Sequence, residues 1–487
     1  MRPQIVIRYV GFVFLFNAFF LLISALISLF NHDTGLFPLA YSFVISLLFG
    51  LFPLIFVPAP DEITNHEGLL IVVGSWILSC FIGMLPYILY GGEFSIPSAW
   101  FESVSGYTTT GATILNNIEG LPKGILFWRA STHFMGGIGI IIFVLAVLPS
   151  TGFVGVQLSR TELSTSTLKQ FRTRTSEAIR IILYIYLGIT VLETVSLLLV
   201  GMNLFDAIVH TFATVATGGF SDKNMSVAAY HSVPIEVVIM FFMILSGTNF
   251  ALLFSAVVGR FSDLKTSSVF KYYLGANFAA TILVTLDLYF SRTYNSFWES
   301  LRYSSFQLLS VGTSTGFANA DSSIWPGFSQ MVIIFFTLQC AMAGSTSGGI
   351  KMDRIVIFFK ATARRIKQVR FPNAVIPLTV DGKKYDDKTV SVAVLYIVVY
   401  VFIVFVSALL LSLMGVDALS AFSGSAAAMG NVGPGLAKVG SLGNYSQIPA
   451  LGKWLLGIVM LLGRLEIFGL IVFFFPQIWK PSNVIRH

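Results

Sequence analysis

The chain contains ten apolar runs that are each long enough to form a helix across a membrane, and no other feature limits its fold as strongly. A helix needs about 20 apolar residues to cross the hydrocarbon core of a bilayer. Seven of the runs carry no charge: residues 9–30, 36–58, 69–92, 134–155, 237–259, 324–350 and 390–416. Three more are interrupted once or twice by a charge: residues 181–200, 272–290 and 454–479. The sequence therefore predicts an all-α polytopic membrane protein with ten crossings.

The composition agrees with burial in a bilayer. Charged residues make up 11% of the chain. The share in a typical soluble domain is about 25%. Hydrophobic residues make up 55%, and phenylalanine alone occurs 46 times. The first apolar run is too long for the core of a cleavable signal peptide, so we expect it to remain as a helix.

The distribution of lysine and arginine predicts the orientation, because cytoplasmic connections are enriched in these residues. The connections 157–180, 260–271 and 351–388 together hold 18 basic and 7 acidic residues. The connections on the opposite side, 93–129, 222–236, 292–321 and 417–453, hold 7 basic and 8 acidic residues. We therefore expect the first group and both termini to be cytoplasmic. The net charge of +7 is mostly such a topology signal, and we predict no nucleic-acid binding.

Four outer connections share an unusual pattern. Each is too apolar for a loop in water, is too short or too broken to span, and ends in a cluster of small polar residues. Aligned on one glycine each, at Gly111, Gly218, Gly316 and Gly433, the clusters recur every 98 to 117 residues. A possible helix N-terminus precedes each of them, at Pro97-Ser98, Asn203, Asn295-Ser296 and Asp417.

The pattern predicts four repeats of a helix–pore loop–helix unit around one central pore. Two extra helices precede these repeats. The expected units are residues 1–65 for the N-terminal helix pair, followed by the repeats 66–156, 157–260, 261–388 and 389–487. The third repeat includes a broken helix with a basic cytoplasmic extension.

Irregular backbone at membrane depth is tolerated only where it is buried in protein or lines a cavity. Four such segments that enter from one side therefore predict one shared cavity. Inward carbonyl oxygens can replace the water around a dehydrated monovalent cation, and short helices that end there would favour a positive charge. A single cluster of this kind is more often a packing feature of apolar helices. Four clusters at near-equal spacing indicate a pore.

With these four loops, the chain resembles the membrane subunit of the Trk potassium-uptake family, of the TrkH/TrkG type. The Ktr subunits and the plant high-affinity potassium transporters belong to the same superfamily. The resemblance covers essentially the whole chain, including the two extra N-terminal helices. The segments that carry it are 108–113 (TTTGAT), 133–139 (HFMGGIG), 344–351 (GSTSGGIK), 372–375 (PNAV) and 462–467 (LGRLEI).

The resemblance implies a potassium selectivity filter in the four loops, with rubidium tolerated. The expected filter residues are Thr109, Thr110, Gly111, Ala216, Thr217, Gly218, Ser314, Thr315, Gly316, Asn431, Val432 and Gly433. The K+ contacts expected within this set are at residues 110, 111, 217, 218, 315, 316, 432 and 433. Each loop has one aligned glycine and no consistent aromatic residue, unlike the filters of tetrameric potassium channels, so we expect moderate selectivity.

The resemblance also implies a homodimer in the bacterial inner membrane with one pore per protomer. It implies regulation by a cytosolic, TrkA-like ring of nucleotide-binding domains. Potassium is then the transported ion, and we expect no organic cofactor on this chain. Basic residues from Lys360 to Arg370 anchor the chain to the cytoplasmic face, and anionic membrane lipid or the partner could also use this surface.

The apolar run 324–350 carries a glycine-rich segment in its middle. Its residues are Gly344, Ser345, Thr346, Ser347, Gly348 and Gly349. Each glycine costs a helix about 1 kcal/mol relative to alanine, so the helix should break here. The segment is either a kink for helix packing or a flexible gate below the filter. The resemblance favours the gate.

Arg464 lies in the middle of the last apolar run. An arginine costs about 2.5–3.5 kcal/mol at the centre of a membrane helix, so it should face water or a partner. We interpret it as a pore-facing residue beside the glycine segment that helps to keep the gate closed. The alternative is a buried ion pair with a carboxylate of another helix.

Two other functions fit the sequence less well than a gated channel does. A secondary symporter that couples potassium to protons or sodium would show inverted repeats or a midplane carboxylate relay, whereas these repeats run in the same sense. A membrane enzyme would need catalytic or metal-binding side chains at one depth. Residues 312–316 match the G-x-S-x-G motif of hydrolases, but they lie in an expected pore loop, so we predict no enzymatic activity.

Overall fold

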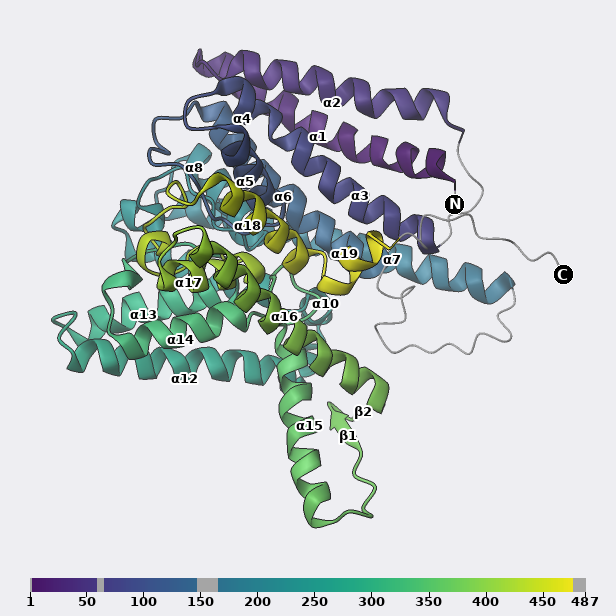
Figure 1. The fold of residues 1–487 in the computed structure, drawn as a ribbon, viewed down its shortest axis with the longest axis vertical. Helices are drawn as coiled ribbons and strands as arrows, with labels where there is room; N and C mark the ends of the chain where they lie inside the picture. The colour runs from purple at the N-terminus through teal and green to yellow at the C-terminus, as the bar shows by residue number, and fades with distance from the viewer. Residues whose placement is uncertain (1, 59–64, 147–164, 476–487) are drawn as a thin grey trace.

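A computed structural model describes residues 2–58, 65–146 and 165–475, and these are mostly helical (Figure 1). The predicted all-α class is confirmed. One short antiparallel hairpin occurs in the described ranges, with β1 (Leu378–Val380) paired to β2 (Lys383–Tyr385). It lies beside α15 (Met352–Arg370), and both project away from the main bundle (Figure 1).

The N-terminal helices form an antiparallel pair at one edge of the bundle. They are α1 (Pro3–Asn31) and α2 (Leu36–Phe56) (Figure 1). The hydroxyl of Ser46 donates to the carbonyl of Phe14 across the pair, at 2.9 Å. Asn17 on α1 donates to Ser79 at 3.1 Å and accepts from Tyr107 at 2.9 Å. The pair is therefore tied to the rest of the bundle through buried polar contacts.

Four short helices precede the four predicted loops. They are α5 (Ile96–Tyr107), α8 (Leu204–Val215), α13 (Phe297–Gly312) and α17 (Ala418–Gly430). Asn203, Ser296 and Asp417 cap the N-termini of the last three, as their sequences predicted, because each side chain accepts a backbone N–H of the first turn. The first helix begins slightly earlier than expected, with Ser95 at the N-cap and Pro97 in the first turn.

The remaining helices vary in length and precede, separate or follow these four elements. They are α3 (Asn65–Gly83), α4 (Leu85–Tyr90), α6 (Lys123–Ala146), α7 (Thr165–Leu199), α9 (Val233–Gly247), α10 (Phe250–Val257), α11 (Phe261–Thr266), α12 (Ser268–Phe290), α14 (Gly327–Leu338), α16 (Asp387–Leu413), α18 (Ala450–Arg464) and α19 (Ile467–Phe473). Short 3-10 turns occur at Ser226–Tyr230, Ser322–Ile324 and Ala437–Val439.

Membrane helices are confirmed, and the count of ten crossings stays a prediction, because several of the apolar runs are bent or broken rather than continuous helices. In the described ranges, six helices are long and apolar enough to span, or seven if the bent pair α9–α10 is one span. That pair bends by 106°. Asn249 stabilises the bend, because its side chain caps α10 by accepting the N–H groups of Ala251 and Leu252. The run 324–350 breaks after Leu338 and the last run after Arg464.

Some predicted features lie outside the described residues. The end of the run 134–155, the end of the run 454–479, the start of the connection 157–180 and the expected boundary at residue 156 are among them. Elsewhere the outer surface of the bundle is apolar. Phe30 is 80% exposed, Phe290 is 75% exposed and Leu413 is 85% exposed. Such exposure is expected for side chains that face lipid rather than water.

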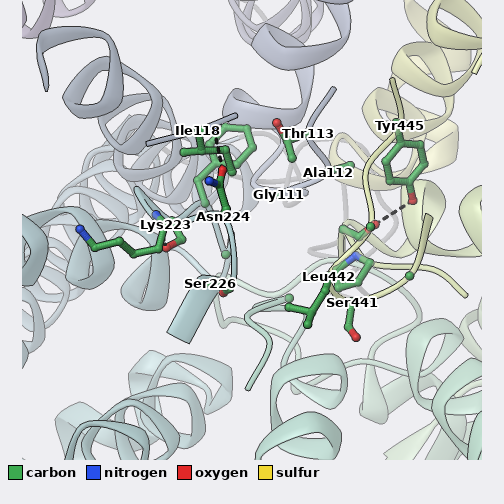
Figure 2. A pocket seen from close by; sticks show the side chains of 18 of the residues that line it. Gly111, Ala112, Thr113, Ile118, Lys223, Asn224, Ser226, Ser441, Leu442 and Tyr445 are labelled. Carbon is green, nitrogen blue, oxygen red and sulfur yellow. Dashed lines mark hydrogen bonds between the residues drawn. The ribbon is translucent and has the colours of Figure 1, made fainter. Parts of the chain in front are cut away.

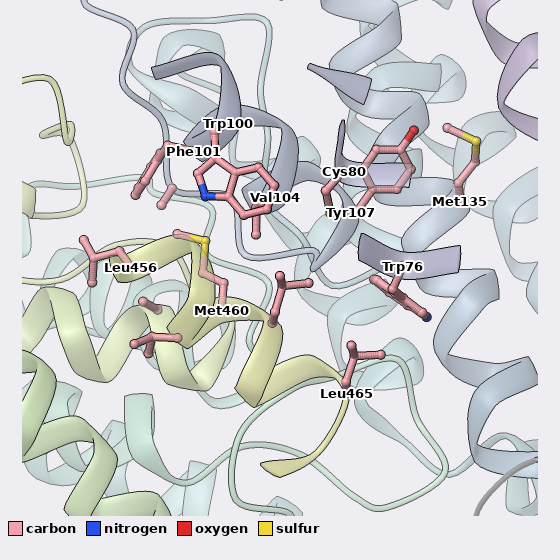
Figure 3. Close-up of a cluster of buried hydrophobic side chains, with 14 of the residues drawn as sticks. Trp76, Cys80, Trp100, Phe101, Val104, Tyr107, Met135, Leu456, Met460 and Leu465 are labelled. Atoms are coloured by element: carbon pink, nitrogen blue, oxygen red, sulfur yellow. The ribbon is translucent and has the colours of Figure 1, made fainter. Parts of the chain in front are cut away.

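The first and last parts of the chain meet in the core. Trp100 of α5 belongs to the buried cluster that Figure 3 shows, and it stacks on Trp454 of α18 with ring centroids 4.9 Å apart. A Cβ at Gly457 would lie 2.4 Å from the indole nitrogen of Trp100, so the glycine is needed for this close packing. The contact brings the fourth short-helix unit next to the first one.

Candidate functional site

Each of the four short helices ends in the same backbone turn. A residue in the left-handed region follows the helix, and a glycine with positive φ follows two positions later. The left-handed residues are Thr109, Thr217, Ser314 and Asn431, with φ between 50° and 57°, and the glycines are Gly111, Gly219, Gly316 and Gly433, with φ between 78° and 96°. Threonine rarely adopts this conformation, so four copies of the turn indicate a specific requirement.

The residue between these two positions closes the helix. Its N–H donates to the carbonyl five residues earlier, which is the hydrogen bond of a Schellman cap. The four bonds are Thr110 to Ser105 (2.8 Å), Gly218 to Ala213 (2.7 Å), Thr315 to Ser310 (2.8 Å) and Val432 to Ala427 (3.0 Å). The four loops are therefore equivalent in backbone geometry although their sequences differ.

This equivalence corrects the alignment in the second loop. The position of Gly111 is taken there by Gly219, which has φ 78°, and Gly218 takes the position of Thr110. The predicted loop residues Ala216, Thr217 and Gly218 are therefore shifted by one, and the equivalent set is residues 217–219. Two adjacent glycines follow Thr217, and the sequence alone does not distinguish which of them takes the position of Gly111.

The four loops close into a ring. A Cβ added at Gly111 would lie 1.9 Å from the carbonyl oxygen of Gly218. An added Cβ would likewise lie 2.1 Å from the carbonyl oxygen of Thr315 at Gly219, 2.0 Å from that of Val432 at Gly316, and 2.5 Å from that of Thr110 at Gly433. Each glycine thus faces a carbonyl of the next loop, and the fourth loop faces the first. All four glycines line one outer cavity of about 60 Å³ (Figure 2).

The carbonyl groups of the ring have almost no hydrogen-bond partners. They belong to residues 109–111, 217–219, 314–316 and 431–433. Within the described part of the chain, only the carbonyl of Gly433 accepts a hydrogen bond, from the hydroxyl of Tyr445 at 2.8 Å. More than about 90% of buried backbone carbonyls in proteins are paired. A ring of unpaired carbonyls is therefore available to a cation that has lost its water.

The ring carries no charged side chain. Its negative potential comes from the carbonyls and from the C-terminal ends of α5, α8, α13 and α17, which all lie at the ring. No group of three or more histidine, cysteine or acidic residues that could hold a metal occurs in the ranges described above. Such a neutral oxygen site suits a weakly hydrated monovalent cation better than a divalent one.

A buried ion pair braces the first two loops, and the sequence did not reveal it. Arg129 of α6 lies 2.7 Å from Glu102 of α5, and both side chains are 2% exposed or less. Arg129 also donates to the carbonyl of Ser221 at 3.1 Å, while Glu102 accepts the N–H of Ile114 at 3.1 Å. These extra hydrogen bonds offset the cost of burying both charges. The pair therefore links the segments that leave the first and second loops.

The glycine-rich segment between α14 and α15 lies against the helix ends that form the ring. Thr346 donates through its hydroxyl to the carbonyl of Val215 at 2.9 Å, and the hydroxyls of Ser347 and Ser314 are 2.8 Å apart. A Cβ at Gly348 would lie 2.5 Å from the carbonyl oxygen of Gly430. The segment therefore contacts the second, third and fourth loops from one side.

The segment has an irregular backbone that its glycines permit. Gly344 and Gly349 have φ of 77° and 64°. Gln339 and Ile350 form an isolated parallel bridge at its base. The predicted break in this helix is therefore present, and the segment doubles back on itself as a loop.

Arg464 contacts the same segment. Its side chain is buried, and its guanidinium donates to the carbonyls of Thr346 at 2.6 Å and Gly136 at 3.1 Å. It forms no ion pair with any described carboxylate. Glu466 instead pairs with Arg354 at 2.8 Å. The alternative of a buried Arg464 ion pair is therefore wrong for the described residues.

Three further contacts of this region were not predicted from the sequence. Asn249, at the bend between α9 and α10, donates to the carbonyl of Ala343 at 2.7 Å, and Phe250 donates its N–H to Gly344 at 3.0 Å. Lys351 donates through its ammonium group to the carbonyl of Ser347. An isolated asparagine inside the run 237–259 was the signal that could have revealed the first contact. The contacts of Asn249 and Phe250 show that the bent helix and the glycine-rich segment form one connected unit.

Comparison with known proteins agrees with this geometry. The family model described as "TrkH: Cation transport protein" matches residues 39–285 and 277–483. The chain is 34% identical to the Trk system potassium uptake protein TrkH of Escherichia coli K12, over 99% of this chain and all of that protein. It is 32% identical to TrkH of Halomonas elongata over the same shares of the two chains.

A solved structure is similar over the whole length. The crystal structure of the potassium transporter TrkH from Vibrio parahaemolyticus matches with a TM-score of 0.90 and 31% identity, and the match covers 99% of this chain and all of that one. Fold, family model and full-length relatives all agree. The chain therefore belongs to the TrkH family of cation transport proteins.

Proposed function

We propose that this protein is the pore-forming subunit of a potassium-uptake system. The observation that carries this proposal is the closed ring of loop carbonyls, which, apart from that of Gly433, accept no hydrogen bond from the described residues. Potassium sheds its hydration shell at lower cost than smaller cations do, and backbone oxygens can replace that shell. The relatives are named potassium uptake proteins, which supports potassium as the ion.

The pore would be built from four units that each contain a helix, a short pore helix with its loop, and a second helix. The short helices are α5, α8, α13 and α17, and the pair α1–α2 precedes the four units. The contact between α5 and α18 supports a cyclic order, because it brings the first and fourth units together. The unit boundaries at residues 65, 156, 260 and 388 belong to this proposal.

The filter would consist of residues 109–111, 217–219, 314–316 and 431–433. One aligned glycine per loop gives few ordered carbonyl layers, so potassium would be preferred over sodium only moderately, and rubidium would pass. The pore transports its cation and needs no organic cofactor on this chain.

The glycine-rich segment from Gly344 to Gly349, with Arg464, would form the gate. Opening requires the segment to leave the helix ends that it contacts. Arg464 stabilises the closed position through its bond to Thr346, and its positive charge repels cations below the filter.

The cellular setting follows from the same reasoning. We infer a bacterial inner-membrane protein with both termini in the cytoplasm, which functions as a homodimer. A cytosolic TrkA-like ring that binds nucleotides would regulate it. Residues 372–384 and the basic face of α15 are the proposed contact with that ring, and anionic lipid headgroups would bind the same basic face. Figure 1 supports an exposed location for this region.

Ion flux into proteoliposomes tests the proposal. Purified protein is reconstituted, and uptake of rubidium and of sodium is measured with and without the cytosolic ring. We expect rubidium uptake above that of empty vesicles, a lower sodium uptake, and a change in rate when the ring and its nucleotide are added. Absence of rubidium uptake in all conditions would contradict the proposed function. A reversal potential that shifts with pH as strict coupling demands would favour a symporter instead.

A further inference from the structure

The fourth loop differs from the other three at its outermost carbonyl. The oxygen of Gly433 accepts a hydrogen bond from the hydroxyl of Tyr445 at 2.8 Å. The equivalent oxygens of Gly111, Gly219 and Gly316 accept none from the described residues. Figure 2 shows Tyr445 at the rim of the outer cavity, with its hydroxyl joined to the loop by this bond.

Tyr445 is fixed in place by its surroundings. It is 2% exposed, and its N–H donates to the carbonyl of Thr113 at 2.8 Å. Its ring packs on Phe101 with centroids 5.2 Å apart. It also fills the space beside Gly424, where a Cβ would lie 3.4 Å from the nearest ring atom. The hydroxyl therefore reaches Gly433 from a rigid position.

Gly424 has no side chain, which explains why only the fourth loop is held through a hydrogen bond to its ring carbonyl. It lies seven residues before the left-handed residue of its loop, and the other short helices carry Glu102, His210 and Gln307 there. Glu102 bonds to Thr113 at 3.0 Å, His210 to Ser221 at 3.0 Å, and Gln307 to the carbonyl of Ala320 at 2.7 Å. Each of these side chains holds the segment that leaves its own loop. None of them reaches a carbonyl of the ring, whereas Tyr445 does.

We propose that Tyr445 is a positioning residue that sets the outermost cation site of the filter. A carbonyl oxygen that accepts a hydrogen bond outside the ring is turned toward the donor and is less available to an ion. The outermost layer then offers three free carbonyls, those of Gly111, Gly219 and Gly316. A cation that enters there keeps more of its water than one in the next layer, so the entry site binds weakly. This inference rests on the proposed potassium pore.

The test is the variant Tyr445→Phe, which removes only the hydroxyl. Rubidium uptake into proteoliposomes is measured over a range of external concentrations. Without its donor, Gly433 can turn its oxygen inward, so the half-saturating rubidium concentration should fall by roughly 2- to 10-fold, the ratio expected for one neutral hydrogen bond. The maximal rate should not rise. Tyr294→Phe is the matched control, because that hydroxyl accepts from Trp325 at 3.1 Å and contacts no ring carbonyl.

An unchanged half-saturating concentration in Tyr445→Phe would overturn the inference, even if the maximal rate falls through poorer folding. Failure of the unsubstituted protein to take up rubidium would instead overturn the proposed function. If the variant does not fold, a rubidium titration of crystals of the unsubstituted protein decides the question. We expect the outermost site to fill at higher rubidium concentration than the layer beneath it, and equal filling would contradict the role of Tyr445.

Discussion

Replacement of Arg464 by alanine should open the pore, and so raise ion flux, in the absence of the cytosolic ring. In the proposed gate, the guanidinium joins two elements that must separate for ions to pass. It donates at 2.6 Å to Thr346 in the glycine-rich segment and at 3.1 Å to Gly136 on α6. The substitution removes both bonds and the positive charge below the filter. No described carboxylate loses an ion-pair partner, so the main effect should fall on the gate.

The size of the effect follows from the bond to Thr346. A hydrogen bond from a charged group contributes about 1.5–3 kcal/mol net. Loss of that bond in the closed state alone raises the ratio of open to closed protein by roughly 10- to 150-fold, since about 1.4 kcal/mol corresponds to a factor of ten. Basal flux should rise by the same factor while the open fraction stays small. Loss of the charge acts in the same direction.

The assay is rubidium uptake into proteoliposomes without the cytosolic ring, normalised to the amount of folded protein. Arg464→Lys keeps the charge but replaces the two donating guanidinium nitrogens with a single ammonium, so its basal flux should lie between those of alanine and arginine. Arg354→Ala is the matched control. It removes an arginine of the same region that pairs with Glu466 and stacks over Tyr396 at 3.9 Å, so it should lower stability without raising flux.

A basal flux in Arg464→Ala equal to that of the unsubstituted protein would refute the gating role. So would a rise of the same size in Arg354→Ala, because it would trace the flux to a general loosening of the bundle.

Three further outcomes are expected. Gly316→Ser and Gly433→Ser should each lower the ratio of rubidium to sodium flux, because the added Cβ would lie 2.0 Å and 2.5 Å from a neighbouring ring carbonyl; unchanged ratios in both would contradict a shared filter. Ser347→Ala should raise basal flux by about 2- to 10-fold, less than loss of the arginine, because it removes the neutral hydrogen bond that ties the segment to Ser314 of the third loop. The hydrogen bond from Thr389 lowers the pKa of Asp386. This N-cap of α16 therefore stabilises the protein above about pH 4, and the stabilisation is lost as the pH falls through the lowered value. Thermal unfolding is measured from acid to neutral pH, and the loss of stability at acid pH should be smaller in Asp386→Asn than in the unsubstituted protein.

The sequence predicted much of the architecture because its signals are local. A run of about 20 apolar residues has few alternatives to a membrane helix. Asn203, Ser296 and Asp417 marked three pore-helix starts correctly, since a cap needs only its own first turn. The break between α14 and α15 followed in the same way from the glycine content of residues 344–349.

Features that depend on distant partners could not be predicted from these signals. The choice of Gly219 over Gly218 is made by contact with Thr315 of the next loop, where no room exists for a side chain. The bend at Asn249 is stabilised by the carbonyl of Ala343, which lies 94 residues further along the chain. Arg464 was expected at the gate, but its acceptors are backbone carbonyls, which carry no signature in the sequence.

Anomalous diffraction from crystals grown with rubidium would test whether the four loops bind the ion. The proposed pore predicts a rubidium peak inside the ring, at similar distances from the carbonyl oxygens of residues 110, 218, 315 and 432. A ring without a peak, with rubidium bound elsewhere at carboxylates, would contradict the assignment of these loops as a selectivity filter.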